Sequence, residues 1–163
     1  MAITLAELVP VLEALRDRAA TAARPSVDAM ADTYKDHLTH VTLRRYFATP
    51  GQFGTSSPPG QPPAWRTGEL ARSVTVIPGL GGGLTATASV GPHVIYARTQ
   101  NEGDVHRPTR ARYMHWVNSG GEWFKKRVKI PARPFMWPAA RECIENGSLT
   151  KAAAEAFLAW VWG

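Results

Sequence analysis

The sequence contains a single cysteine, Cys143, and several features that mark other classes of protein are also missing. One cysteine cannot form an intramolecular disulfide, so we expect a reducing compartment and a small buried side chain at Cys143. No stretch reaches the roughly 18 to 20 apolar residues that span a bilayer. The early acidic residues Glu7, Glu13 and Asp17 argue against a secretion signal. We therefore expect a protein that works away from membranes.

The usual short catalytic signatures are absent as well. There is no G-x-S-x-G elbow, no H-E-x-x-H, no Walker loop and no cysteine pair. His37 and His40 stand three residues apart beside Asp36, a spacing that suits a metal, but no further ligand cluster supports a site there. We predict no enzyme activity, no cofactor and no metal. A hydrolase remains an alternative, because catalytic residues distant in sequence can meet in a fold.

The positive charge of the chain is local. A chain of 163 residues with 44% hydrophobic and 20% charged residues is expected to form one globular domain. Of the net charge of +6, residues 103–145 supply +5, with nine Lys/Arg against four Asp/Glu. Such a stretch suits a nucleic acid, an acidic protein surface or a solvated face, and charge alone does not choose between them.

The N-terminal part predicts two helices followed by a long loop. Apolar periodicity indicates a helix over residues 4–23, which Pro10 should kink or delay. A second helix is predicted over residues 26–46, with Ser26 as its N-cap. Residues 47–65 contain five prolines and no periodic pattern. They are either a mobile linker or an arm that orders on a neighbouring subunit.

The central part predicts a short helix and a hairpin. Thr67 is a credible N-cap for a helix that continues to about Ser73. The stretches "SVTVIPG" and "LTATASVG" predict two strands joined by Gly79–Gly83. Because these glycines lead into a strand and not into a helix, we favour a hairpin over a phosphate-binding loop.

The next segment, "VHRPTRARYMHWVNSGGEWFKKRVKI", is basic and aromatic. Its cations and the rings of Tyr113, Trp116 and Trp123 could bind a single-stranded nucleic acid. A hairpin with its aromatic rings inward and its cations outward explains the same letters, and we favour it. The candidate interface or DNA contacts are Arg107, Arg110, Arg112, Lys125, Lys126 and Arg127.

The C-terminal part predicts two helices, residues 135–146 and 149–162, separated by a turn at Asn146 and Gly147. Trp160 and Trp162 make its end apolar, which indicates docking onto this domain or onto a partner. The whole pattern predicts an α+β fold, with two N-terminal helices packed on a small antiparallel sheet and closed by C-terminal helices.

A proline-stiffened segment leads into those helices. Pro131 and Pro134 fix their own backbone angles and bias the preceding residues to extended conformations. We expect a rigid path that holds Arg133 between them, with Phe135 and Trp137 anchoring the junction. A well-packed turn without a partner is the alternative.

Three stretches in this order, "PPAWRTGELARSV", "VGPHVIYARTQNEGD" and "IPARPFMWPAARE", resemble the tail-component family of long-tailed bacteriophages. Its members are neck or tail-completion proteins that join the DNA-filled head to the tail. The resemblance covers roughly residues 58–145. The insertion "VHRPTRARYMHW" is longer, and the stretch "FKKRVK" more cationic, than the family pattern. The residues that match are Thr67, Gly68, Leu70, Ser73, Tyr96, Ala97, Glu102, Gly103, Pro131, Arg133, Pro134 and Phe135.

This resemblance implies a virion structural protein, made in the bacterial host cytoplasm and placed at the head-to-tail interface. It implies a ring of six copies that lines or seals the channel for genomic DNA and contacts adjoining neck and tail-tube proteins, with no membrane and no small-molecule substrate. The alternatives are a tail terminator or head-side stopper of the same neck and, more remotely, a basic nucleic-acid-binding module.

Overall fold

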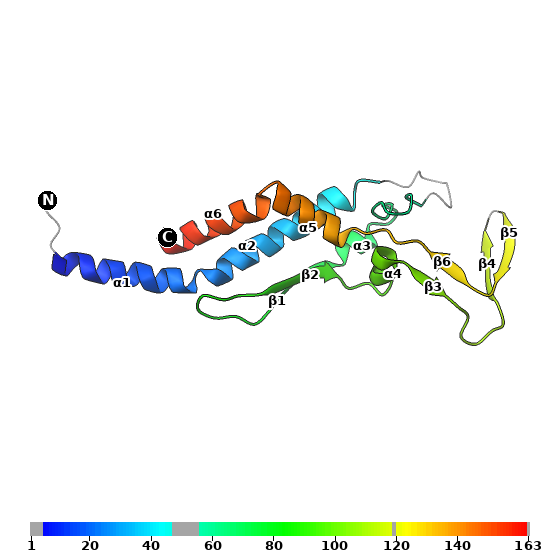
Figure 1. The fold of residues 1–163 in the computed structure, drawn as a ribbon, viewed down its shortest axis with the longest axis horizontal. Coiled ribbons are helices and arrows are strands. Elements are labelled where there is room, and N and C mark those ends of the chain that lie inside the picture. The colour runs from blue at the N-terminus through cyan, green and yellow to red at the C-terminus, as the bar shows by residue number, and fades with distance from the viewer. Residues whose placement is uncertain (1–4, 47–55, 119, 163) are drawn as a thin grey trace. The chain divides into compact units, whose positions relative to one another are not determined.

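The computed structural model describes residues 5–46, 56–118 and 120–162, which fold as two compact units (Figure 1). Unit 1 comprises Met1–Asp36, Thr75–Gly91 and Arg141–Gly163, and unit 2 comprises His37–Val74 and Pro92–Ala140. Helices and small antiparallel sheets alternate along the chain, with helices at both ends. The predicted α+β class is therefore confirmed. The expected single domain stays a prediction, and each unit is described separately.

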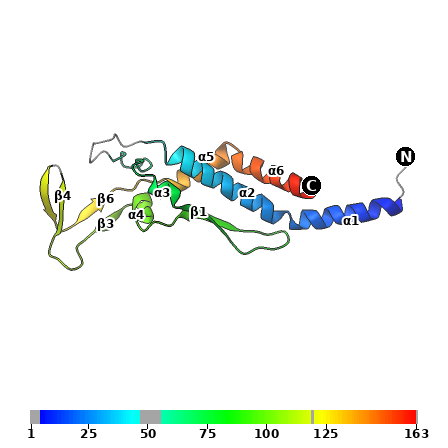
Figure 2. The same cartoon turned by 180° about the vertical axis from the view of Figure 1, so that it is seen from behind.

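Unit 1 is built from three long helices. They are α1 (Leu5–Thr21), α2 (Ala23–Asp36) and α6 (Ser148–Trp162). Helix α6 runs antiparallel to α2 along most of its length, and its end meets α1 (Figures 1 and 2). Helix α1 is already helical at Leu5 and continues through Pro10, so the proline does not delay the start of the helix.

The second helix begins earlier than predicted, and Ser26 is not its N-cap. Helix α2 starts at Ala23, and the Ser26 hydroxyl donates a hydrogen bond back to the Ala22 carbonyl at 2.8 Å. This is the i to i−4 bond of a serine inside a helix. Pro25 lies in the first turn, where its missing N–H costs no helical hydrogen bond. The proline-serine pair therefore marked a position inside the helix and not its boundary.

The predicted helix over residues 26–46 also changes character partway. Helix α2 ends at Asp36, and a π-helical turn, η1 (His37–Thr42), follows it in unit 2. Leu38, Thr39 and Thr42 of this turn are buried. A wider turn places these neighbouring residues in the interior together, which the 3.6-residue periodicity of the sequence does not indicate.

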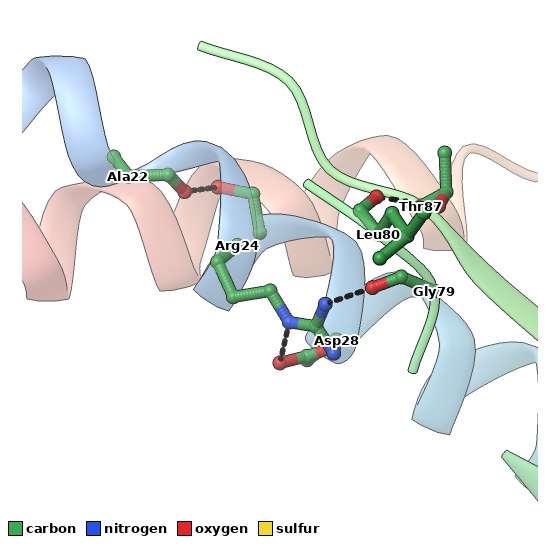
Figure 3. Close-up of polar contacts among 7 residues, drawn as sticks. Ala22, Arg24, Asp28, Gly79, Leu80 and Thr87 are labelled. Atoms are coloured by element: carbon green, nitrogen blue, oxygen red, sulfur yellow. Dashed lines mark hydrogen bonds and ion pairs between the residues drawn. The ribbon is translucent and has the colours of Figure 1, made fainter. Parts of the chain in front are cut away.

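The predicted glycine-linked hairpin is confirmed in β1 (Val74–Pro78) and β2 (Ala88–Pro92). Its loop is held to α2 by Arg24, whose guanidinium donates to the Asp28 carboxylate and to the Gly79 carbonyl, both at 2.9 Å (Figure 3). The Thr87 hydroxyl closes the loop by donating to the Leu80 carbonyl at 2.8 Å (Figure 3). A charged donor shared between helix and loop is stronger than a neutral one, so Arg24 fixes the hairpin to the helices.

Unit 2 contains short helices and two further two-stranded sheets. Strand β3 pairs antiparallel with β6, and β4 pairs antiparallel with β5, so His106 lies opposite Val128 and Trp116 opposite Trp123. Helix α4 was not predicted. The elements are α3 (Glu69–Arg72), α4 (Ala97–Glu102), β3 (Asp104–His106), β4 (Met114–Asn118), β5 (Gly121–Lys125) and β6 (Val128–Ile130).

The predicted pair of C-terminal helices is confirmed as α5 (Met136–Glu145) and α6. They part at Gly147, whose φ of 70° favours glycine, and the Asn146 carboxamide accepts the Ser148 N–H at 2.9 Å. Cys143 is fully buried, as predicted. Burial raises the pKa of its thiol, which keeps it in the protonated, unreactive form.

Tyr34 on α2 gives a prediction about alkaline pH. Burial, with a smaller contribution from Cys143, raises the pKa of Tyr34 from 10.0 to about 12. The folded state therefore prefers neutral Tyr34, and this stabilisation is complete below pH 10 and lost as the pH rises toward 12. We expect Tyr34→Phe to remove part of the fall in unfolding free energy across this window, on the order of 1 kcal/mol after discounting for the partly exposed ring.

Urea unfolding of the wild type and Tyr34→Phe at several pH values checks this, with tyrosinate absorbance of the folded proteins as a second readout. The difference in unfolding free energy between the two proteins should shift with pH. A constant difference across the window would contradict the prediction.

Candidate functional site

The three sequence stretches behind the phage resemblance lie together in unit 2. The Tyr96 hydroxyl donates to the Glu69 carboxylate at 3.4 Å, which joins α4 to the start of α3. The Arg133 N–H donates to the Gln100 carbonyl at 2.8 Å, which joins the proline-rich segment to α4. Residues separated by more than sixty positions in sequence thus form one packed junction. We call residues 67–73, 96–103 and 131–135 the junction.

Arg133 is the buried cation of the junction. It is only 9% exposed, and its guanidinium donates to the Ser57 carbonyl at 3.0 Å and to the Pro131 carbonyl at 3.4 Å. The Gly60 N–H donates to the Ala132 carbonyl at 2.9 Å nearby. A buried charge is tolerated only when its donors are satisfied, so Arg133 binds the chain itself and is not presented to DNA or to a partner.

The bonds of Ser57 and Gly60 place part of the predicted arm, residues 47–65, against the chain itself. Residues 47–55 lie outside the described part of the chain. Residues 56–65 pack within unit 2, where Pro62 and Pro63 are buried and the Tyr46 hydroxyl donates to the Gln61 carboxamide at 2.9 Å. The second half of the predicted arm is therefore held by the chain's own residues.

Asn101 caps the helix that follows the junction. Its carboxamide oxygen accepts the N–H of Phe135 at 3.1 Å and the N–H of Met136 at 3.3 Å, at the start of α5. These are amides that a helix leaves without internal partners. Phe135 is fully buried, so the predicted anchoring holds for this residue, whereas Trp137 is 70% exposed and anchors nothing within the described chain.

The start of α3 differs in detail from the prediction. Gly68, with φ of 75°, occupies the cap position, while the Thr67 hydroxyl accepts the Glu69 N–H at 3.3 Å from one residue earlier. A Cβ at Gly68 would lie 2.5 Å from the Trp65 ring. Glycine is therefore required here by both backbone angle and space. The Ser73 hydroxyl ends the helix by donating to the Leu70 carbonyl at 2.8 Å.

A pocket of about 370 Å³ opens at the junction. Its lining includes Trp65, Gly68, Glu69, Tyr96, Gln100 and Arg133. Burial, and then the negative charge of Glu69, raise the pKa of Tyr96, so Tyr96 stays a neutral hydrogen-bond donor. The lining residues include no histidine or cysteine, and the hydroxyl–carboxylate pair among them is Tyr96 with Glu69. Across the described residues, no group of three or more His, Cys, Asp or Glu side chains is placed to hold a metal.

The predicted contact cations lie on a second feature of unit 2, which we call the basic arm, residues 104–130. Arg107, Arg110, Arg112, Lys125, Lys126 and Arg127 are all exposed. Within the described chain none of the six makes an ion pair with an acid. The guanidinium of Arg112 lies 5.6 Å from the Tyr113 ring centre. The arm therefore presents unneutralised positive charge.

The aromatic side chains of the basic arm do not point into a core, which corrects the prediction that they face inward. Trp123 is 43% exposed, Phe124 59% and Val117 65%. His115 stacks on Phe124, with ring centres 4.5 Å apart. A hairpin of two strands has no second layer of its own to cover a face, so its apolar side chains stay at the surface.

Unit 1 carries an apolar surface of its own, which we call the helical face. Trp160 donates from its indole N–H to the Thr21 hydroxyl at 3.1 Å, and Arg18 donates to the Val161 carbonyl at 3.3 Å, so α6 docks onto α1, one of the two alternatives expected for the C-terminus. Trp160 is nevertheless 49% exposed and Trp162 70%. The other exposed members are Leu8, Val9, Val11, Leu12, Phe157 and Leu158.

The two units differ in charge. Unit 1 holds nine Asp/Glu against six Lys/Arg, a net charge of −3, whereas unit 2 holds thirteen Lys/Arg against four Asp/Glu, a net charge of +9. The sequence showed a basic stretch, but it did not show that three separate parts of the chain fold into an acidic unit. That assignment needed the fold, because unit 1 gathers three separate stretches of the chain.

Comparison with protein-family models, with curated protein sequences and with solved structures found no match to this chain. No helix among residues 5–46, 56–118 and 120–162 has both the length and the apolar character needed to cross a bilayer. Sequence reasoning missed Asn101 of the junction and Ser57, whose carbonyl accepts a hydrogen bond from Arg133. An asparagine and a serine within polar stretches carry no signal until their partners, far away in sequence, are known.

Gly103 of the junction provides a test with a matched control. Its φ is 75°, and a Cβ there would lie 2.7 Å from the Ala132 nitrogen and 2.9 Å from the Ile130 carbonyl oxygen. We expect Gly103→Ala to lower the free energy of unfolding by about 1 to 3 kcal/mol, because both the backbone and the neighbouring strand must shift. Gly82→Ala, at a glycine with open space around it, should be close to neutral.

Urea unfolding of both variants beside the wild type measures these changes. Equal effects of the two substitutions would contradict the close packing at Gly103.

Proposed function

We propose that this protein is a structural component of a phage neck, where copies form a ring that joins the DNA-filled head to the tail and surrounds the exit channel. The resemblance of the three junction stretches to phage tail components suggests this role. In support, the same stretches meet in one place in unit 2. The finer placement, as tail-completion protein, tail terminator or head-side stopper, stays open among these neck roles.

The observation that carries the proposal is the amount of apolar surface left exposed on both units. Trp162 and Trp137 are each 70% exposed, and the aromatic and aliphatic side chains of the basic arm are also at the surface. Isolated exposed apolar residues are common, but gathered aromatic ones mark protein interfaces. Exposed apolar surface of this kind supports a role in assembly.

A repeated contact between two different surfaces of one chain explains the ring form. Such a heterologous contact joins each copy to the next and closes when its rotation completes a circle. The helical face of unit 1 and the basic arm of unit 2 are two different surfaces. In this role the mechanism is geometric: buried apolar area holds the copies, and no chemical step is needed.

We expect the purified full-length protein, alone or with adjoining neck and tail-tube proteins, to form closed rings. Light scattering coupled to size exclusion measures the mass, and negative-stain electron microscopy shows the shape. Detection of the chain in purified virions by mass spectrometry provides an independent check. A permanent monomer that is absent from virions would contradict the proposed function.

A second candidate is nucleic-acid binding, favoured by the exposed cations and rings of the basic arm. If three of these cations bind phosphates, replacing Lys125, Lys126 and Arg127 by alanine should flatten the salt dependence of DNA binding. The expected change is about 0.9 in the log–log slope for each phosphate that the variant no longer neutralises. Fluorescence anisotropy with labelled DNA at several salt concentrations measures the slope.

The matched control replaces Arg16, Arg141 and Lys151 of unit 1 by alanine, which removes the same net charge. Its slope should stay at the wild-type value. If both triple variants change the slope equally, binding follows net charge alone, and the arm is no DNA site.

A further inference from the structure

The pairing of β4 with β5 separates the side chains of this hairpin onto two faces. Residues directly opposite each other in an antiparallel pair lie on the same face, and neighbours along a strand point to opposite faces. Trp116 lies opposite Trp123, and Met114 lies opposite Lys125. The two tryptophans therefore share one face with Lys125. We call the face with these four residues the tryptophan face.

The acidic side chain of the hairpin lies on the other face. Phe124 lies opposite His115, and Val117 lies opposite Glu122. The stack of His115 on Phe124, and the 3.6 Å between His115 Nε2 and the Glu122 carboxylate, agree with this assignment. Glu122 is the single acidic residue in the sequence from 107 to 130. The tryptophan face thus carries positive charge and no negative charge.

The two indole rings are neighbours at the surface. Trp123 is 43% exposed, and Trp116 is partly exposed. Side chains directly opposite each other have Cβ atoms about 4.5 to 5.5 Å apart, so the two rings form one patch. Among the described strands, β4 and β5 pair only with each other, so no further strand continues the sheet beside this patch.

Cations gather at one end of the tryptophan face. Residues 107–113 and 126–127 are the two connections between the β3–β6 pair and the β4–β5 pair. Both connections join the hairpin at the end where Met114 lies opposite Lys125. They carry five of the six exposed cations of the basic arm, which are Arg107, Arg110, Arg112, Lys126 and Arg127.

We propose that the tryptophan face binds a single-stranded nucleic acid, whose bases stack on Trp116 and Trp123 and whose phosphates contact Lys125 and the cations of the two connections. This inference rests on the second candidate function, nucleic-acid binding, and names the binding face and the kind of strand. Stacking on a side chain needs a base whose flat face is open, which a single strand offers and a duplex does not. The opposite face, with Phe124 and Val117, stays available for protein contacts.

An acidic protein segment is the weaker partner for this face. Its carboxylates would neutralise the cations, but the face of an indole is the negative side of the ring quadrupole and does not attract an anion. A nucleotide matches both parts of the surface, because its base stacks on a ring while its phosphate binds a cation.

Fluorescence anisotropy of the full-length chain with labelled strands tests the inference. The probes are single-stranded DNA and RNA of about 12 nucleotides, within the length that such sites cover, and a DNA duplex of the same length. We expect the wild type to bind a single strand about tenfold or more tightly than the duplex, because only the single strand gains stacking. Preference for DNA or for RNA then identifies which strand the face takes.

Substitution of the rings separates stacking from charge. Trp116→Ala with Trp123→Ala should lower the single-strand affinity about fivefold or more and leave duplex binding unchanged. The salt dependence of binding should keep its wild-type slope, because no phosphate contact is removed. Trp116→Phe with Trp123→Phe keeps an aromatic ring at each position and should retain most of the affinity.

The matched control lies on the other face of the same hairpin. Val117→Ala with Phe124→Ala should leave the single-strand affinity unchanged, with folding of all variants checked by circular dichroism. Equal losses from the two double alanine variants, or equal binding of single strand and duplex by the wild type, would overturn the inference. Binding of polyglutamate that is weakened by the same tryptophan substitutions would assign the face to an acidic protein partner instead.

The inference and the neck role fail separately. If the protein forms rings and is found in virions but shows no ring-dependent preference for single strands, the inference is wrong while the neck role stands. If that preference is found in a permanent monomer that is absent from virions, the inference stands without the neck role.

Discussion

The buried guanidinium of Arg133 is the constraint around which unit 2 is organised. A charge removed from water must find acceptors within the fold, and Arg133 finds them in the carbonyls of Ser57 and Pro131. Its own N–H, bonded to Gln100, brings α4 to the same place. Removing the guanidinium would leave two carbonyls unsatisfied, and losing either carbonyl would leave a buried charge. Segments near positions 57, 100 and 133 are therefore fixed together.

The direction of α5 follows from this arrangement. Pro131 and Pro134 limit the backbone on either side of Arg133, and Asn101 then accepts the first free amides of the helix. Fully buried Phe135 closes the joint. The interior of unit 2 thus satisfies its charge and its polar backbone locally. The cations of the basic arm, outside this junction, remain available for contact with other molecules.

The distribution of apolar surface supports the proposed assembly. Unit 1 buries one side of α2 and α6 against each other but leaves tryptophans and α1 leucines exposed, and unit 2 leaves its arm uncovered. The pocket at the junction is lined by a raised-pKa tyrosine, a carboxylate and a buried arginine that are already hydrogen-bonded within the fold. Such groups hold structure, whereas the uncovered rings and helices are suited to bind other chains.

Local patterns predicted the elements that local forces determine. The turn at Gly147, the glycine-linked hairpin and buried Cys143 follow from periodicity, glycine geometry and side-chain size, and the structure confirms each of them. The prediction that Ser26 is an N-cap was wrong because a serine hydroxyl forms a hydrogen bond equally well as a cap or inside a helix. Here it bonds the Ala22 carbonyl, which places Ser26 inside the helix. Helix α4 was missed because five of its six residues are polar, so it carries no periodic apolar stripe.

By itself, the amino-acid sequence determined the α+β class, the helices at both ends, the basic central stretch and the rigidity of residues 131–134, because each depends on neighbours along the chain. Only the tertiary structure decided that Arg133 is buried, that the rings of the arm are exposed, and that acidic and basic residues separate into two units. These properties depend on which distant segments supply hydrogen-bond acceptors or cover apolar faces, and spacing along the chain does not encode those partners.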